Sequence, residues 1–328
     1  MCYLCLASAA EEHMARYRHA LPQLDGSFFL TDGGIETTLI FHEGLELPDF
    51  AAFHLLQTDA GGAALRKYFR TYAEIAARFR AGLILESATW RANADWGARL
   101  GYSREALAEA NREAIRLLEE IRADFERSGG RAVISGAIGP RGDGYSPERI
   151  MSEAEAEAYH AEEIETFAGT AADMVCAITM NYAEEALGIA RAARRAGLPV
   201  ALSFTVETDG ALPTGQPLQD AIAQVDHATS GYPTYYGINC AHPDHFAPTL
   251  AKGGPFTDRI RGLRANASRM SHAELNEAQA LDVGNPVELG QQYAELRRRL
   301  PRLNVFGGCC GTDQRHVECI AAACAPLF

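Results

Sequence analysis

The sequence lacks several features that define large classes of proteins. It has no run of 18 consecutive apolar residues, so no transmembrane helix is expected. Its 30 basic residues are outnumbered by 43 acidic ones, which gives a net charge of −13 at pH 7. Because nucleic acids and anionic membranes both attract a basic face, neither is expected as a partner.

Targeting signals and disulfide frameworks are also missing. The first ten residues carry no basic side chain, and residues 1–25 are expected to form an N-terminal arm or helix instead of a signal peptide. Eight cysteines in 328 residues are too sparse for a disulfide scaffold and predict a reducing, cytoplasmic location. No low-complexity linker divides residues 26–328, which predicts one domain there. The oligomeric state stays open, with a homo-oligomer among the options.

Short apolar runs alternate with helical patterns along the whole chain. Helices are expected over 105–126, 153–168 and 184–196, the second opened by a capping box at Ser152 and the third ended by Gly197. Strands are expected over 28–31, 83–86, 132–135, 174–178, 200–205, 235–238, 260–265 and 303–306. Eight βα units predict an α/β protein with the (β/α)8, or TIM, barrel fold. The alternative is an open doubly wound sheet, but its dinucleotide-binding form loses support because no Gly-x-Gly-x-x-Gly follows the first strand.

Chemically informative residues gather at the ends of the expected strands. In a TIM barrel, active-site residues come from the carboxyl ends of the strands, so such residues should meet at one rim. The residues in question are Asp32 and Gly33 after the first strand, Glu86 at the end of the second, 136–140 after the third, Asn239 and Cys240 after the sixth, Asn266 after the seventh, and Cys309 and Cys310 after the eighth.

The cysteines of this rim predict a metal site. Cys309 and Cys310 are adjacent in a glycine-rich loop, and neighbouring cysteines do not easily bridge each other. Together with Cys240 they provide three thiolates, which can hold Zn²⁺ tetrahedrally with one position open. Taken singly, Cys240 has the alternative of a small buried residue, and the cysteine pair has that of a structural or redox role. His242 and His245 are competing ligands close to Cys240.

An open position on zinc suits a thiol substrate. Zinc lowers the pKa of a bound thiol and so provides a thiolate at neutral pH. A thiolate can attack a methyl group on a sulfonium or a quaternary nitrogen, and this reaction needs little acid–base machinery from the protein.

The motifs at this rim carry a resemblance to a known family. Residues 31–37, 135–140, 237–240, 264–266 and 307–311 resemble the homocysteine S-methyltransferase family, a zinc-dependent (β/α)8 group. The resemblance implies zinc on Cys240, Cys309 and Cys310. It also implies that Asp32 and Gly33 hold the amino-acid end of a homocysteine-like acceptor, with S-methylmethionine, betaine or a similar onium compound as methyl donor and methionine as product. Glu86 and Asn239, at the same rim, are further candidates for substrate binding.

One position departs from the family pattern. Ile178 aligns with a glutamate that helps to bind the amino group of the acceptor, and an apolar side chain cannot neutralise an ammonium. Either another acid serves, with Glu36, Glu86, Glu207 and Asp209 available, or the acceptor is not ordinary homocysteine. The alternatives are therefore a related methyltransferase or demethylase acting on a different sulfur compound, and a zinc- or thiol-binding protein without turnover.

Aromatic residues follow the second and third strands. Trp90, Trp96 and Tyr145 could form a cation–π wall for a methylated donor. The alternative is that these rings only pack beneath a loop.

Overall fold

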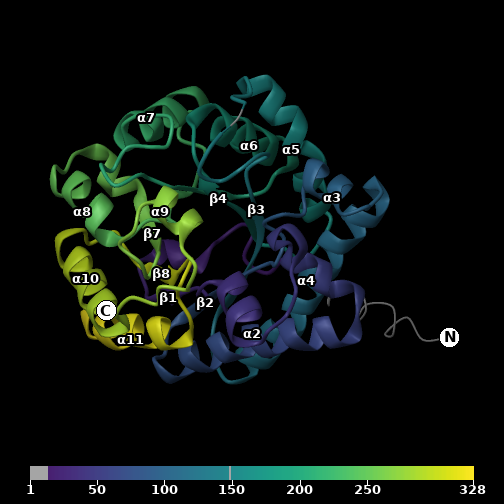
Figure 1. Ribbon diagram of the computed structural model, residues 1–328, viewed down its shortest axis with the longest axis horizontal. Helices are drawn as coiled ribbons and strands as arrows, with labels where there is room; N and C mark the ends of the chain where they lie inside the picture. The colour runs from purple at the N-terminus through teal and green to yellow at the C-terminus, as the bar shows by residue number, and fades with distance from the viewer. Residues whose placement is uncertain (1–13, 148) are drawn as a thin grey trace.

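A closed ring of parallel strands forms the centre of the molecule (Figure 1). The computed structural model describes residues 14–147 and 149–328. Within them β1 pairs with β2 on one side and with β8 on the other, which closes the ring and confirms the TIM barrel over the open sheet. The strands are β1 (Phe29–Leu30), β2 (Gly82–Glu86), β3 (Ala132–Ile138), β4 (Met174–Met180), β5 (Val200–Phe204), β6 (Tyr235–Asn239), β7 (Ile260–Ala265) and β8 (Val305–Gly308).

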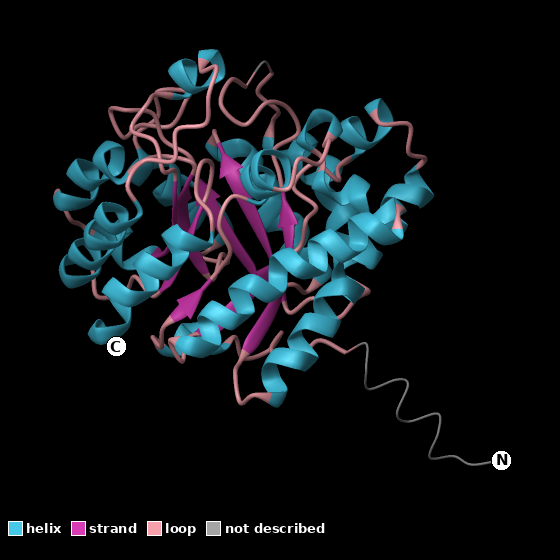
Figure 2. Ribbon diagram, turned by 60° about the horizontal axis from the view of Figure 1, so that its bottom comes forward, coloured by secondary structure: helices cyan, strands magenta, loops and turns pink. Residues whose placement is uncertain are grey.

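Helices surround the barrel, and loops gather at one of its ends (Figure 2). Strands β2, β5 and β6 are buried along their whole length, as expected for parallel strands covered by helices on one face and by interior side chains on the other. The helices are α2 (Asp59–Arg78), α3 (Ala94–Arg99), α4 (Arg104–Arg127), α5 (Glu153–Ala168), α6 (Ala183–Ala196), α7 (Leu218–Thr229), α8 (Pro243–Ala251), α9 (His272–Glu277), α10 (Pro286–Arg299) and α11 (Gln314–Cys324).

Local signals in the sequence set several helix ends as predicted. The side chain of Ser152 accepts from the backbone of Glu155 and the Glu155 side chain returns the bond, so the capping box at the start of α5 is present. Gly197 ends α6 with φ of 71°, a left-handed conformation that favours glycine.

The third strand runs beyond its predicted end. Residues 136–138 belong to β3, whereas the sequence predicted that they follow it. Gly136 explains the difference, since a Cβ there would lie 2.7 Å from the ring of Phe167 on α5. This glycine makes room for a helix and does not end the strand.

The barrel interior is filled at the end opposite the loops. Apolar side chains from successive strands, including Phe29, Ile84 and Met174, form one buried cluster with Leu21 of the N-terminal segment. Gln23, in the short 3-10 helix η1 (Pro22–Asp25), is also buried, and its backbone oxygen accepts from Asn304 at 2.8 Å. The described part of the predicted arm, residues 14–25, therefore contacts the barrel, and residues 1–13 lie outside the described residues. The division at residue 25 stays a prediction.

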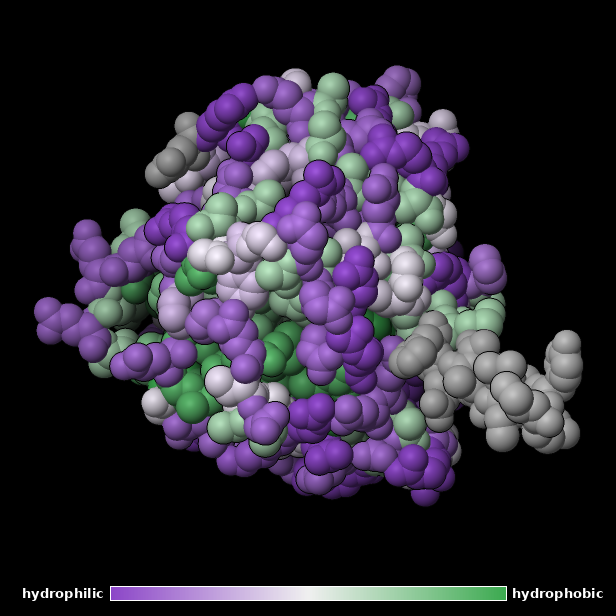
Figure 3. Space-filling view, turned by 90° about the vertical axis from the view of Figure 1, so that its right-hand side faces the viewer, coloured by the Kyte–Doolittle hydropathy of each residue, from purple (hydrophilic) through white to green (hydrophobic). Residues whose placement is uncertain are grey.

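Hydrophilic residues dominate the face of the molecule drawn in Figure 3. Helix α4 carries ion pairs three residues apart, between Glu109 and Arg112 at 3.1 Å and between Glu113 and Arg116 at 2.7 Å. Of the helices described, none has the length and apolar character needed to cross a membrane.

Candidate metal and substrate site

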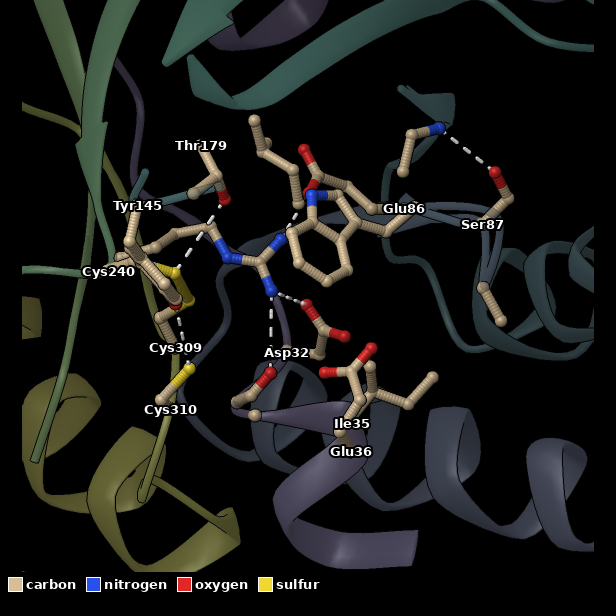
Figure 4. A pocket seen from close by; sticks show the side chains of 17 residues that line it. Asp32, Ile35, Glu36, Glu86, Ser87, Tyr145, Thr179, Cys240, Cys309 and Cys310 are labelled. Carbon is tan, nitrogen blue, oxygen red and sulfur yellow. Dashed lines mark hydrogen bonds and ion pairs between the residues drawn. A yellow bond between two sulfur atoms is a disulfide. The ribbon is translucent and has the colours of Figure 1, made fainter. Parts of the chain in front are cut away.

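Three cysteines converge at the loop end of the barrel (Figure 4). Cys240 directly follows β6, and Cys309 and Cys310 directly follow β8. Their sulfur atoms all lie within 4.8 Å of one another. The structure thus brings together the three residues predicted as metal ligands, and soft thiolates in such a cluster suit Zn²⁺.

Two of these cysteines are bonded to each other. Cys240 and Cys309 form a disulfide with their Cα atoms 5.3 Å apart, whereas Cys310 is free. The sequence predicted three thiols and no bond between them. Because a disulfide sulfur is not a thiolate, this bond must be reduced before all three cysteines can bind a metal.

The backbone of Cys240 is held by its neighbours. It has a positive φ of 54°, which is uncommon for a residue with a side chain. Its carbonyl oxygen lies 2.6 Å from Nε2 of His272, and its N–H donates to the carbonyl oxygen of Arg264. These contacts fix the direction of the Cys240 side chain.

The amide of Asn239 is hydrogen-bonded within the protein, and its predicted contact with substrate stays a prediction. Its Oδ1 accepts from the backbone N–H of Thr179 at 2.9 Å, and its Nδ2 donates to the Thr179 hydroxyl at 2.9 Å. Thr179 has a φ of 63°, and its hydroxyl lies 3.7 Å from the sulfur of Cys240. The Asn239 amide is therefore used within the protein, where it supports a strained residue beside the metal site.

A cavity opens beside the cysteines. Its lining includes the predicted substrate residues Asp32, Gly33 and Glu86, together with Ile178. Ile178 also packs against the apolar cluster inside the barrel, so the position aligned with a glutamate is part of an apolar wall. A Cβ on Gly33 would lie 2.7 Å from the Tyr72 hydroxyl, which makes glycine necessary for this close approach.

Arg264 lies in the same cavity and pairs with both acids. Its Nη2 is 2.6 Å from Oδ1 of Asp32, its Nη1 contacts Oε2 of Glu86, and its Nε donates to the Gly308 carbonyl (Figure 4). The side chains of Arg264, Asp32 and Glu86 are only 13%, 7% and 6% exposed. Burial lowers the pKa of Arg264, but the charges of Asp32 and Glu86 raise it overall, so the guanidinium stays charged.

Arg264 is a residue of the site that was not predicted from the sequence. A signal was present, because Arg264 is the second-to-last residue of β7, at the barrel end where functional side chains gather. Which groups the guanidinium would contact depends on strands β1 and β2, and sequence spacing alone does not show this.

Glu36 is a further carboxylate in the cavity lining. It is partly buried, and within the described part of the chain its side chain makes no hydrogen bond or ion pair with another side chain. Burial, with a smaller contribution from the charge of Asp32, raises its pKa to about 7.

Tyr145 and His272 lie over the cysteines. The Tyr145 hydroxyl is 3.5 Å from the sulfur of Cys310, and its ring stacks on that of His272 with centroids 4.2 Å apart. Nδ1 of His272 lies 2.9 Å from Oε1 of Glu207, so one acid that the sequence offered for substrate is engaged by a histidine. Asp209, another of those acids, accepts from the backbone of Ala211.

The two tryptophans bind a cation that belongs to the protein. The guanidinium carbon of Arg91 lies 4.1 Å from the ring centroid of Trp90 and 3.9 Å from that of Trp96. Trp90 also lines the cavity, whereas Trp96 is not part of its lining. Tyr145 lines the cavity as well, so of the three rings suggested as a wall for the donor only Trp96 lies outside the lining, and a role in donor binding stays a prediction.

The two histidines near Cys240 form hydrogen bonds with backbone groups. Nδ1 of His242 accepts from the N–H of Asp244 at the start of α8, and Nε2 of His245 lies 2.9 Å from the Arg269 carbonyl oxygen. In the described residues, the metal-like cluster consists of the three cysteines without either histidine.

Known proteins resemble this chain over most of its length. It is 25% identical over 317 residues to homocysteine S-methyltransferase 4 of Zea mays, which covers 91% of this chain and 90% of that protein. The fold is similar to that of the homocysteine methyltransferase MmuM from Escherichia coli. The oxidized form of MmuM gives a TM-score of 0.72 at 19% identity, covering 94% of this chain and 99% of that one. The metallated form gives 0.70 at 19% identity, covering 92% and 98%.

A family model matches nearly the whole chain. The model of the family described as homocysteine S-methyltransferase matches residues 29–324, which run from β1 to the end of α11. The match includes the whole barrel and all three clustered cysteines. The chain therefore belongs to the homocysteine S-methyltransferase family and is a methyltransferase.

Proposed function

We propose that this enzyme is zinc-dependent and transfers a methyl group from an onium compound, such as S-methylmethionine or betaine, to the thiol of homocysteine, giving methionine. The observation that carries the proposal is the convergence of Cys240, Cys309 and Cys310 beside a cavity at the carboxyl ends of the strands. Reduced to thiolates, these residues would hold Zn²⁺ and leave a fourth position for the acceptor.

The donor set fits zinc in its chemistry. Three sulfur ligands from two loops are typical of zinc sites, and Cys240 and Cys309 are close enough to have bonded to each other. Bound zinc would supply one thing to the reaction, a lower pKa for the acceptor thiol. The metallated form of the Escherichia coli relative supports a metal in this family, although its name does not specify the ion.

The protein itself would bind and orient the substrates and exclude water from the site. We assign to Asp32, Gly33 and Glu86 the shaping of the subsite for the amino-acid end of the acceptor, because all three line the cavity. Tyr145 and His272, stacked over the cysteines, would cover the reacting sulfur. This positioning would accelerate the reaction because it holds the acceptor sulfur in line with the methyl group of the donor.

The transfer step needs no redox partner. The acceptor thiol loses its proton to solvent, its thiolate sulfur attacks the methyl carbon in line, and a new C–S bond forms. The bond from that carbon to the positive sulfur or nitrogen of the donor breaks, and its electron pair stays with the leaving group. The products are methionine and a neutral thioether or tertiary amine. Because three thiols must stay reduced, we further propose a cytoplasmic location.

The test uses reduced, zinc-loaded protein and measures zinc content and methionine formation. Homocysteine is supplied with S-methylmethionine, betaine or S-adenosylmethionine in separate reactions. We expect about one zinc ion per chain and methionine from at least one donor. Cys310→Ala should lose both zinc and activity, whereas Cys319→Ala, the control on α11 away from the cluster, should keep both.

Other outcomes would identify the alternatives. Bound zinc without methylation of any thiol would refute the transferase proposal and leave a zinc- or thiol-binding protein. Methylation of a different thiol, with homocysteine inert, would indicate a related enzyme for another sulfur compound. The apolar Ile178 in the cavity lining is the observation that favours this second candidate.

A further inference from the structure

The cavity contains two carboxylates that are already paired with a cation of the protein, Arg264. Asp32 accepts from Arg264 through Oδ1 and from the Tyr68 hydroxyl at 2.9 Å through Oδ2. Glu86 is bound by the same guanidinium. An ammonium group arriving with a substrate would find both carboxylates already bound to a cation.

A second wall of the cavity, at Ile178, has neither a negative charge nor a hydrogen-bond acceptor in its side chain for a cation. Ile178 lines the cavity and packs into the apolar cluster of the barrel interior. An ammonium placed against this side chain would lose its hydration without gaining a hydrogen bond, which is costly.

Glu36 differs from the other acids of the lining. Its carboxylate faces the cavity near Asp32 (Figure 4), and no other described side chain pairs with it. The neighbouring cluster of two carboxylates and one guanidinium carries one net negative charge. The electrostatic environment of the cavity therefore favours a cationic group over an anionic one. The Glu36 carboxylate accepts a hydrogen bond from its own backbone N–H and keeps further lone pairs for such a group.

We propose that Glu36 binds the ammonium group of the acceptor amino acid and so selects thiols that carry this group. This inference rests on the proposed function, because that function supplies homocysteine as the acceptor. It assigns to a residue of the β1–α2 loop the contact that Asp32 and Glu86 cannot provide while Arg264 occupies them.

The ammonium of the acceptor is a better match for Glu36 than the onium centre of the donor. The donor loses its positive charge as the methyl group leaves, so a carboxylate beside it would stabilise the ground state more than the transition state and slow the reaction. The ammonium of the acceptor keeps its charge throughout. A contact with it holds the substrate equally in both states and affects binding without opposing transfer.

The test measures binding by titration calorimetry on reduced, zinc-loaded protein, without any methyl donor. The two ligands are L-homocysteine and 4-mercaptobutanoate, which is homocysteine without its amino group. In the wild type, homocysteine should bind more tightly than its analogue. Glu36→Gln should raise the Kd for homocysteine about tenfold or more and leave that for 4-mercaptobutanoate unchanged, because a charged hydrogen bond is lost with little change in shape.

A matched variant controls for general effects of charge. Glu46→Gln removes an exposed carboxylate from the same connecting segment and should change neither Kd. Thermal unfolding of both variants checks that the fold is intact. Since binding is measured without turnover, a failure to methylate homocysteine would count against the proposed function and not against the role of Glu36.

Three outcomes would overturn the inference. The first is an unchanged Kd for homocysteine in Glu36→Gln. The second is equal affinity of the wild type for the two thiols, which would mean that the ammonium has no site. The third is that Asp32→Asn weakens homocysteine binding more than Glu36→Gln does, which would mean that the substrate displaces the Arg264 guanidinium.

Discussion

Replacing Arg264 with methionine tests the electrostatics of the cavity most directly. The change removes the cation shared by Asp32 and Glu86 and leaves two carboxylates buried, at 7% and 6% exposure, without it. Breaking a buried pair by removing one partner typically costs about 3–5 kcal/mol. The low exposure of all three side chains means that solvent screening reduces this cost little.

The loss of stability should depend on pH, and its sign follows from the carboxyl groups. Burial already raises the folded-state pKa values of Asp32 and Glu86 against the opposing charge of Arg264, and without Arg264 these values would rise further above the unfolded values near 4. A carboxyl group whose pKa is higher in the folded state stabilises that state when the pH is below the unfolded-state pKa. This stabilisation is lost as the pH rises through the folded-state pKa. The variant should therefore be closest to the wild type in acid and furthest from it at neutral pH.

Urea unfolding of reduced, metal-free protein between pH 5 and pH 8 measures this effect. Arg269→Met is the control, because Arg269 is 52% exposed in its pairs with Asp244 and Glu288, and its loss should cost under about 1 kcal/mol at every pH. Neutralising both acids in the Arg264→Met background should restore much of the stability. A loss of similar small size in the two arginine variants, or one independent of pH, would refute the reasoning.

Three further predictions concern the cysteines, Asn239 and Gly197. Protein carrying the Cys240–Cys309 disulfide should bind zinc only after reduction, which a zinc-sensitive dye can follow; full binding by the oxidised form would contradict the thiolate site. Asn239→Ala should lower zinc affinity about tenfold or more in the same assay, because Thr179 loses both hydrogen bonds that hold it beside Cys240, and an unchanged affinity would remove its positioning role. Gly197→Ala should destabilise the fold by about 1 kcal/mol in urea, since φ is 71° there, and a stabilised variant would argue against that conformation.

Much of the fold could be predicted because its signals are local. The capping box at Ser152 and the glycine stop at Gly197 act within one turn of the chain, so the ends of α5 and α6 were accessible to sequence reasoning. The extension of β3 was missed because the reason for Gly136 lies on α5, at Phe167, far along the chain.

The position of the candidate site could be predicted from the sequence, but the contacts between its side chains could not. Barrel geometry places strand ends at one rim, so Cys240 could be expected near Cys309. The choice of partners within the rim depends on side-chain directions that spacing does not encode. This is why the contacts of Arg264 and the internal hydrogen bonds of Asn239 emerged only from the structure, and why the sequence could offer Glu36 only as one of four acids.

The apolar packing at the barrel end opposite the loops limits how small molecules can reach the cavity. Leu21 and Gln23 close the end opposite the loops, and the interior beneath the cavity is packed with apolar side chains. In the part of the chain that the structure describes, small molecules therefore reach the cavity from the loop end of the barrel. Under the proposed function, the acceptor and the donor would share this entrance with both products.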